Sequence, residues 1–243
     1  MMRIYFIFTT LMTLMLASCA TADLSLSESA ERDYFKAERL VQSEQYARAG
    51  QYLQKYIANY PYSKYATAAQ ILRIKTAYLN DEFILSETLT SRFITAHPEH
   101  PQRDYAEYTL GMSYYEQSES AKHEQVFSKK AKDTFLALNK RNPNNAYAQE
   151  AIQKIQILTN RIAEHEMIIG KFYYERHLYV GAINRFIVVK NKFIESNIAP
   201  ESLYWLAASY LALQQKVYAH EVIQQLQSTF AGNAWQKKAE KLI

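Results

Sequence analysis

The sequence predicts an all-α protein built from repeated helix-turn-helix units. The 243 residues include only 5 glycines and 5 prolines, few enough to favour long helices joined by short turns. Apolar side chains recur three and four positions apart, which is the spacing of one helix face. A pattern of a small residue, a large residue and a helix-ending residue recurs along the chain. Together these observations favour a stack of helix pairs, and no long stretch alternates as a strand would.

The first unit, residues 31–60, shows the two helices of a pair. Its apolar residues form two sets with helical spacing, separated by Glu44 and Gln45, which we expect to form the turn. The two sets are Tyr34, Ala37, Leu40 and Val41, then Ala49, Leu53, Tyr56 and Ile57. Polar residues stand where helix caps or further turns are needed, at Ser63, Asn80 and Asn142.

Five positions that end a helix mark the repeats. They are Pro61, Pro98, Pro143, Ile194 and Ala231. Twelve residues before each lies a small side chain, namely Ala49, Ser86, Ala131, Ala182 or Ala219. This spacing resembles the tetratricopeptide repeat, a helix pair of about 34 residues. Small residues let the two helices of a pair approach closely, so we expect a solenoid of five such repeats with a concave groove.

The intervals between these markers predict two insertions. Successive markers lie 37, 45, 51 and 37 residues apart, so extra residues are expected near 118–132 and near 147–161. The first of these segments overlaps the lysine-rich piece FSKKAKD, residues 127–133. Such a run is typical of a solvated helix face, and the alternative is a patch for an anionic partner.

The amino terminus predicts a lipid anchor. Arg3 precedes the mostly apolar run IYFIFTTLMTLMLA, which is shorter than the roughly 20 residues of a membrane-spanning helix and is typical of a secretory signal. The run ends in Leu-Ala-Ser-Cys, which resembles a bacterial lipobox, and Cys19 is the only cysteine of the chain. We expect residues 1–18 to be a signal peptide and residues 19–28 to hold the lipidated Cys19 and a linker. The alternative is an incidental or buried cysteine.

Composition and motifs argue against an enzyme and against nucleic-acid binding. The formal net charge of +4 over 243 residues is too weak to suggest a nucleic-acid partner. His97 and His100 form HPEHP without a third metal ligand, and His165 begins a zinc-protease-like motif whose second ligand position is Ile169. Neither a nucleophile elbow nor a phosphate-binding loop occurs in the sequence. We therefore expect no catalytic residue, no metal and no cofactor.

Two segments carry a more specific resemblance. Residues 91–116 and 161–186 are similar to the signature segments of the BamD-type lipoproteins of outer-membrane β-barrel assembly. The first match consists of Arg92, Phe93, Ile94, Pro98, His100, Pro101, Asp104, Tyr105, Tyr108 and Gly111. The second consists of His165, Glu166, Tyr173, Tyr174, Arg176, Tyr179, Ala182, Asn184 and Arg185. With the lipobox and the five repeats, the resemblance covers nearly the whole chain.

The resemblance implies a scaffold at the periplasmic face of a bacterial outer membrane. Repeats 1–3, residues 29–146, would receive targeting peptides of unfolded outer-membrane proteins, and repeats 4–5, residues 147–243, would hold the barrel-forming subunit and accessory lipoproteins. The residues implied for the peptide pocket are Tyr62, Tyr65, Arg73 and Tyr78. Those implied for the subunit interface are Tyr174, Arg176, Asn184 and Arg185. Lipidated Cys19 would tether the chain to the membrane.

The chain also departs from the family pattern. SESAKHEQVFSKK, which begins at Ser118, replaces a longer acidic loop, and Phe193-Ile194 replaces Tyr-Pro, which predicts that the helix of the fourth repeat runs on further. Two other functions stay open at this point. A pilotin-type lipoprotein also combines a lipobox with repeats and escorts a secretin. A periplasmic enzyme such as a peptidoglycan hydrolase is the third possibility.

Overall fold

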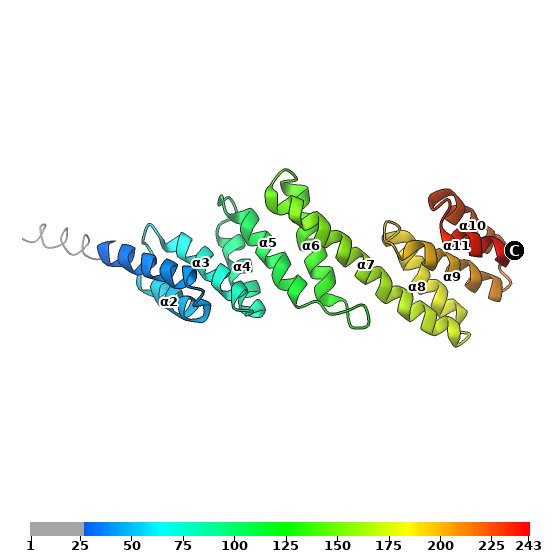
Figure 1. Cartoon of the computed structure of the whole chain (residues 1–243), viewed down its shortest axis with the longest axis horizontal. Coiled ribbons are helices and arrows are strands. Elements are labelled where there is room, and N and C mark those ends of the chain that lie inside the picture. Colours follow the sequence, from blue (N-terminus) through cyan, green and yellow to red (C-terminus); the bar gives the residue numbers. More distant parts are fainter. Residues whose placement is uncertain (1–26) are drawn as a thin grey trace, which may run out of the picture. The chain divides into compact units, whose positions relative to one another are not determined.

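The computed structural model describes residues 27–243, and all regular structure in this range is helical (Figure 1). A first helix covers residues 27–42. It is followed by α2 (Tyr46–Asn59), α3 (Ala66–Leu79), α4 (Phe83–Ala96), α5 (Arg103–Glu116), α6 (Val126–Arg141), α7 (Ala146–Glu175), α8 (Tyr179–Lys192), α9 (Ala199–Ala212), α10 (Lys216–Thr229), α11 (Ala234–Ala239) and the 3₁₀ turn η1 (Glu240–Leu242). The all-α prediction is confirmed, and residues 27–229 form five consecutive helix pairs. The predicted signal peptide and Cys19 lie outside the described residues.

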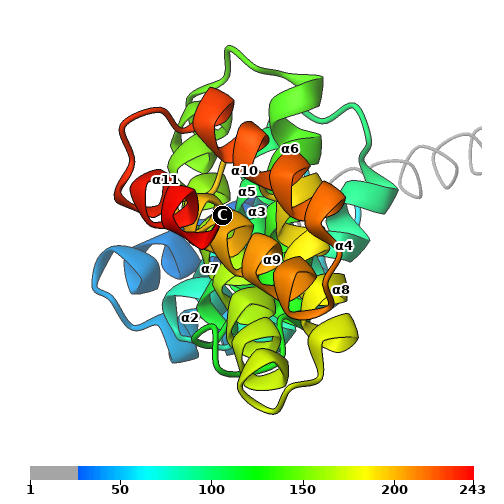
Figure 2. The same cartoon turned by 90° about the vertical axis from the view of Figure 1, so that its right-hand side faces the viewer.

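Two compact units divide the chain between Thr109 and Leu110, within α5. In the first unit, α2 packs against α3 and α3 against α4. In the second, α7 packs against both α6 and α8, while α9 packs against α8 and α10. The short α11 covers the carboxy-terminal end of this second unit beside α9 and α10 (Figure 2). Within residues 27–243, no helix has both the length and the apolar character needed to span a bilayer. It remains a prediction that residues 29–146 bind targeting peptides and that residues 147–243 bind the other subunits of the complex.

Four of the turns inside the helix pairs share one backbone geometry. In each turn one residue other than glycine lies in the left-handed region, with φ between 57° and 60°; these residues are Glu44, Asp81, His177 and Gln214. In the last of them the amide of Gln214 donates to the carbonyl of Leu211, and the amide of Gln215 donates to that of Tyr210, both at 2.9 Å. This pair of bonds is the Schellman arrangement, which satisfies carbonyls left open at a helix end. The predicted turn at Glu44 and Gln45 is thus confirmed.

The turns between successive pairs also repeat, and proline is not required for them. Five residues donate their amide to the carbonyl four positions earlier and accept from the amide three positions later: Tyr60, His97, Asn142, Phe193 and Phe230. Three of these are followed directly by Pro61, Pro98 or Pro143, as the sequence suggested. At the other two the same bonds form without proline, so the packing of the neighbouring helices is sufficient to fix the turn.

The prediction that the fourth repeat's helix runs on past Phe193 is wrong. Helix α8 ends at Lys192, and the amide of Ser196 closes the turn by donating to the carbonyl of Phe193 at 2.9 Å. The ring of Phe193 is buried against Ile162, Val189 and other side chains of that core. Continuing the helix would move this ring out of the core, and burying an aromatic side chain contributes roughly 1.5–3 kcal/mol. Burial of Phe193 therefore ends the helix at the place where the first repeat has Tyr60-Pro61.

Glycine permits the closest helix contacts in the second unit. A Cβ atom built on Gly170 of α7 would lie 2.4 Å from Cε1 of Phe186 of α8, and one on Gly111 of α5 would lie 2.4 Å from Cε1 of Phe135 of α6. Both rings are fully buried. Each phenylalanine therefore packs directly on the backbone of the first helix of its pair, and any side chain there would push the two helices apart.

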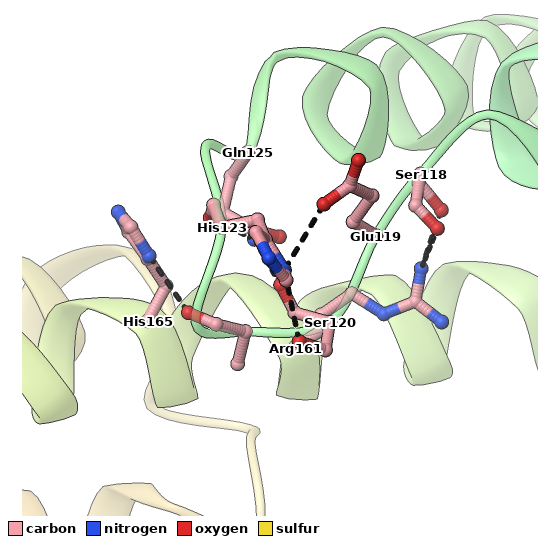
Figure 3. Close-up of polar contacts among 8 residues, drawn as sticks. Ser118, Glu119, Ser120, His123, Gln125, Arg161 and His165 are labelled. Carbon is pink, nitrogen blue, oxygen red and sulfur yellow. Dashed lines mark hydrogen bonds and ion pairs between the residues drawn. The ribbon is translucent and has the colours of Figure 1, made fainter.

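The third pair replaces the left-handed turn with a longer loop, residues 117–125, which lies against α7 (Figure 3). Arg161 donates to the hydroxyl of Ser118, and Nδ1 of His165 lies 2.8 Å from the carbonyl oxygen of Ala121, which can only accept. Inside the loop, Nε2 of the Gln125 side chain donates to the backbone carbonyls of Ser120 and His123. The predicted insertion near 118–132 is therefore a docked loop, whereas that near 147–161 is part of the 30-residue helix α7.

Tyrosine side chains build much of the core at the amino-terminal end of the first unit. The rings of Tyr34 and Tyr65 stack with centroids 4.7 Å apart, and Tyr56 packs edge-on against Tyr34. Burial, together with a hydrogen bond to Asp33, raises the pKa of Tyr52 to about 12. Burial likewise raises the pKa of Tyr34. These phenols are therefore packed in their neutral form.

Replacing Gly170 by Ala should destabilise the chain because the new methyl group meets the buried ring of Phe186. Overpacking of this kind costs about 1–3 kcal/mol, which outweighs the better helix propensity of alanine. Gly50→Ala in α2 is the matched control, since its Cβ would lie 3.5 Å from Oγ1 of Thr76, an ordinary contact. In urea denaturation the midpoint should fall for Gly170→Ala and stay level or rise for Gly50→Ala. An unchanged midpoint for Gly170→Ala would contradict the close approach.

Removing both anchors of the docked loop should release it from α7. In the double variant Arg161→Ala, His165→Ala, we expect residues 117–125 to exchange amide hydrogens faster, at a cost of about 1 kcal/mol per lost hydrogen bond. Glu164→Ala changes an exposed position on the same helix and is the control. Hydrogen exchange read by mass spectrometry checks this. Unaltered protection of the loop would show that other contacts hold it.

The stability of the first unit should fall at alkaline pH. The unfolded-state pKa of tyrosine is about 10, whereas that of Tyr52 in the folded chain is about 12. The folded state therefore holds this proton more tightly, and the resulting stability is complete below about pH 10 and is lost as the pH rises towards 12. Thermal melts should show a shallower alkaline decline for Tyr52→Phe. Tyr62→Phe, which alters a ring 98% exposed, should decline like the unaltered chain.

Candidate partner-binding sites

A cavity of about 170 Å³ lies in the first unit, between α2, α3 and α4. Ile57, Leu89 and Phe93 supply its apolar wall. Phe93 is buried, Ile57 and Leu89 are half-buried, and exposed Ala96 also lines the cavity. The site arises because successive helices of the repeat each turn one face towards the same space. It combines an apolar wall with a few polar groups, as ligand sites commonly do.

Two guanidinium groups are the polar feature of this cavity. Arg73 of α3 and Arg92 of α4 both line it, and no acidic residue is among its eight described lining residues. Nη2 of Arg73 donates to Oε1 of Gln54 at 3.1 Å, which fixes the orientation of the group. Burial and, next, the positive charge of Arg92 lower the pKa of Arg73, while Glu82 opposes this less strongly. The cavity is thus a place where positive charge is unfavourably concentrated.

His97 and Gln70 complete the cavity lining. Nε2 of His97 lies 3.1 Å from Oε1 of Gln70, and the His97 ring packs on Phe93 with centroids 4.9 Å apart. In the same turn, Nδ1 of His100 accepts from the amide of Gln102 at 3.1 Å. Both histidines of the HPEHP segment therefore make structural contacts in this turn. Among residues 27–243, no cluster of three His, Cys, Asp or Glu side chains is placed to hold a metal.

The structure does not bring the four predicted pocket residues together around the cavity. Arg73 lines it, whereas Tyr62, Tyr65 and Tyr78 do not. Tyr62 is 98% exposed, and Tyr65 belongs to the aromatic stack with Tyr34. Tyr78 is half-buried and its ring centroid lies 5.8 Å from that of Phe83. Of the predicted set, only Arg73 therefore has the surroundings of a binding residue. A role for Tyr62 as an exposed contact stays a prediction.

In the second unit, Arg185 of α8 forms an ion pair with Glu166 of α7. Nη1 of Arg185 lies 3.1 Å from Oε2 of Glu166. The side chain of Glu166 is 9% exposed and that of Arg185 is 41% exposed. The carboxylate is therefore largely enclosed, and it orients a guanidinium whose outer edge reaches solvent. Such an arrangement leaves part of the planar donor set of Arg185 able to meet a carboxylate from another chain.

The other predicted interface residues have mixed surroundings. Asn184, beside Arg185 on α8, is exposed, and so is Arg176 at the end of α7. The guanidinium carbon of Arg176 lies 3.6 Å from the ring centroid of Phe172. Tyr174 instead packs between Tyr179 and Trp205, at centroid distances of 5.4 and 5.0 Å, and burial raises its pKa. Tyr174 therefore stabilises the helix packing, while the others reach the surface.

The sequence analysis did not identify Arg92 and Glu166 as candidate functional residues, although both belong to the matched segments. Arg92 and Glu166 entered only as matching positions of signature segments, and their partners in space could not be read from spacing. Nineteen residues separate Glu166 from Arg185, and nineteen separate Arg73 from Arg92. This shared separation gave no usable signal, because the two pairs stand at different places relative to the turn between their helices. His165 and Arg161 likewise gave no signal for anchoring the loop.

Curated relatives resemble the chain over most of its length. It is 26% identical to the outer membrane protein assembly factor BamD of Rickettsia prowazekii, over 84% of the chain and 81% of the relative. It is also 26% identical to the assembly factor BamD of Neisseria gonorrhoeae, over 92% of both chains. Among solved structures, the TPR-like repeats of a kinesin light chain from Podosopora anserina cover 87% of this chain and 96% of their own, with 14% identity and a TM-score of 0.39.

A family comparison covers the five helix pairs almost completely. The family described as "YfiO: Outer membrane lipoprotein" matches residues 27–226. This range begins at the first described helix and ends within α10, so it includes both the arginine-lined cavity and the Arg185–Glu166 pair. The chain therefore belongs to the YfiO family of outer membrane lipoproteins.

Proposed function

We propose that this protein is a scaffold for the assembly of β-barrel proteins at the bacterial outer membrane. The observation that carries the proposal is the family match over residues 27–226, supported by relatives named as outer membrane protein assembly factors. A helical repeat array presents side chains to other polypeptides and is suited to binding rather than catalysis. The names of these relatives favour assembly over the pilotin and hydrolase alternatives.

The proposed anchor is Cys19. Lipidation of its thiol would tether the chain to the inner leaflet of the outer membrane, and two or more acyl chains give stable anchoring. Between Cys19 and the first described helix lie seven residues, 20–26. An extended chain spans at most about 3.6 Å per residue, so this linker would keep the first repeat within a few nanometres of the bilayer surface.

The proposed contact with the barrel-forming subunit centres on Arg185, with Asn184 and Arg176 beside it. Glu166 supports this role because it holds the guanidinium in place while leaving its outer edge exposed. An incoming carboxylate would meet a cation already ordered by its neighbour, which reduces the entropy lost on binding. Tyr174 would contribute indirectly, by packing α7 against Trp205.

The proposed site for targeting peptides of unfolded outer-membrane proteins lies in the first unit. The cavity between α2, α3 and α4 supports this placement because it includes the predicted residue Arg73 and offers an apolar wall. Handover of the peptide to the barrel-forming subunit would complete the function. Accessory lipoproteins of the complex are proposed further partners of repeats 4–5.

Reversing the charge of Arg185 should weaken subunit binding. Removing one member of a charge pair that is buried in an interface leaves the other charge unpaired, which costs about 2–5 kcal/mol. Arg185→Glu would leave the carboxylate of the barrel-forming subunit without its partner, so recovery of that subunit should fall more than tenfold. Lys192→Glu makes the same charge change at an exposed position of α8 and is the control. Pull-down from detergent extract, with helicity checked by circular dichroism, measures the effect.

Arg185→Lys separates the two roles of the side chain. Lysine can keep an ion pair with Glu166 but cannot copy the planar fork of arginine. We therefore expect a stable fold with reduced recovery of the subunit. Full recovery with both Arg185 variants would remove this residue from the interface, whereas absence of the subunit from the unaltered pull-down would contradict the proposed function itself.

A further inference from the structure

The chain enters the first helix pair at one edge of the first unit. The first helix begins at Ser27, and α2 runs back along it, so the turn that follows α2 lies beside this beginning. One contact shows this directly, because Nζ of Lys64 lies 3.1 Å from Oε2 of Glu31, and Glu31 is about one helical turn from Ser27. We call the turn at residues 60–65 and the first turn of this helix together the amino-terminal edge.

This edge lies within reach of the bilayer when Cys19 carries the proposed lipid. Residues 20–26 connect Cys19 to the first helix, and seven residues extend over at most about 25 Å. The opposite edge of the same pair, at Glu44, lies roughly 24 Å from the amino-terminal edge, because the first helix has 16 residues that each rise about 1.5 Å. The amino-terminal edge is therefore the part of the pair that the tether holds next to the membrane.

Tyr62 is the side chain that this edge offers to a membrane. Its ring is 98% exposed, and a tyrosine ring with a polar hydroxyl at its tip is favoured at the level of the lipid headgroups. Other exposed large apolar side chains of the first unit lie elsewhere. Phe35 lies about halfway along the first helix, and Leu79, Ile84 and Leu85 flank the turn between α3 and α4, which belongs to the opposite edge.

The charges of the amino-terminal edge nearly cancel. Its cations are Arg32 and Lys64, both exposed, and its acidic residues are Glu28, Glu31 and Asp33. Lys64 is paired with Glu31 at 3.1 Å, and Nε of Arg32 lies 3.9 Å from Oδ1 of Asp33. A contact with lipid at this edge would therefore depend on the tyrosine ring more than on attraction between charges, and salt should affect it little.

We propose that the amino-terminal edge rests on the headgroup region of the bilayer, with the ring of Tyr62 among the headgroups and Lys64 and Arg32 directed to lipid phosphates. The inference rests on the proposed lipid anchor at Cys19, and it adds a second contact that orients the first repeat. Because the tether makes this contact intramolecular, its effective concentration is high and a weak interaction is sufficient. A chain held at two places can no longer turn about its anchor.

The test measures the depth of single spin labels in the full lipidated chain, bound to vesicles of phosphatidylethanolamine and phosphatidylglycerol. Cys19 is the only cysteine, so an introduced cysteine is the one thiol left to label once Cys19 is lipidated. Asn59→Cys places the label beside the amino-terminal edge, and Gln42→Cys places it at the opposite edge; both positions are exposed. The label at residue 59 should lose most of its collisions with a water-soluble nickel chelate, whereas the label at residue 42 should keep them.

Variants connect this protection to the tyrosine ring. Tyr62→Ser should restore collisions with the chelate at residue 59, while Tyr62→Phe should keep the protection because its ring still reaches the headgroups. Tyr218→Ser, which removes an exposed ring of α10 in the second unit, is the matched control and should change nothing. High salt should leave the protection in place. Circular dichroism and the melting temperature confirm that each variant is folded.

The outcomes separate this inference from the anchor on which it rests. Equal exposure of the two labels to the chelate, or protection at residue 59 that persists in folded Tyr62→Ser, would overturn the membrane contact and leave the anchor intact. If the Cys19→Ser chain floated with vesicles as well as the unaltered chain, the anchor itself would be wrong. Protection at residue 59 by an added peptide and not by vesicles would make Tyr62 a peptide contact and overturn the inference.

Discussion

The two helices of each pair pack so closely that small residues are needed where they meet. At Gly170 and Gly111 the backbone of the first helix touches a phenylalanine ring of the second, and in the other pairs buried alanine and serine residues serve at the helix contacts. A single pair cannot enclose its own apolar face. Each pair must therefore stack on the next, and small residues allow the stacking to continue along the chain.

This packing requires a backbone conformation at four turns that is unfavourable for residues with a Cβ atom. Glu44, Asp81, His177 and Gln214 adopt a left-handed conformation that costs a residue with a Cβ atom roughly 1 kcal/mol or more. The cost is accepted because the turn brings the second helix directly onto the first and satisfies its last carbonyls. In the third pair the longer loop cannot use this device, and side chains of α7 secure it instead (Figure 3).

Charge is distributed over this scaffold in two contrasting ways. In the second unit, Arg185 already has an enclosed carboxylate partner, which stabilises the folded chain and orients the cation. In the first unit, Arg73 and Arg92 share a cavity without an acidic lining residue among those described. The first arrangement suits a surface that docks against a folded partner. The second has unfavourable electrostatics that a ligand could relieve, which is the usual sign of a binding site.

The helical class, the five pairs and the places of most turns could be read from the order of residues alone, because helical periodicity and small residues at a fixed spacing are local properties. The sequence also identified Arg73 and Arg185 as candidates. Packing between helices was needed to show that the half-buried rings of Tyr65 and Tyr174 lie against other aromatic rings. The same holds for the burial of Phe193, which ends α8. It also holds for Arg92 and Glu166 as the neighbours of Arg73 and Arg185. Those outcomes depend on which side chains of two different helices come into contact, and the spacing of residues along the chain does not give the distance between such side chains.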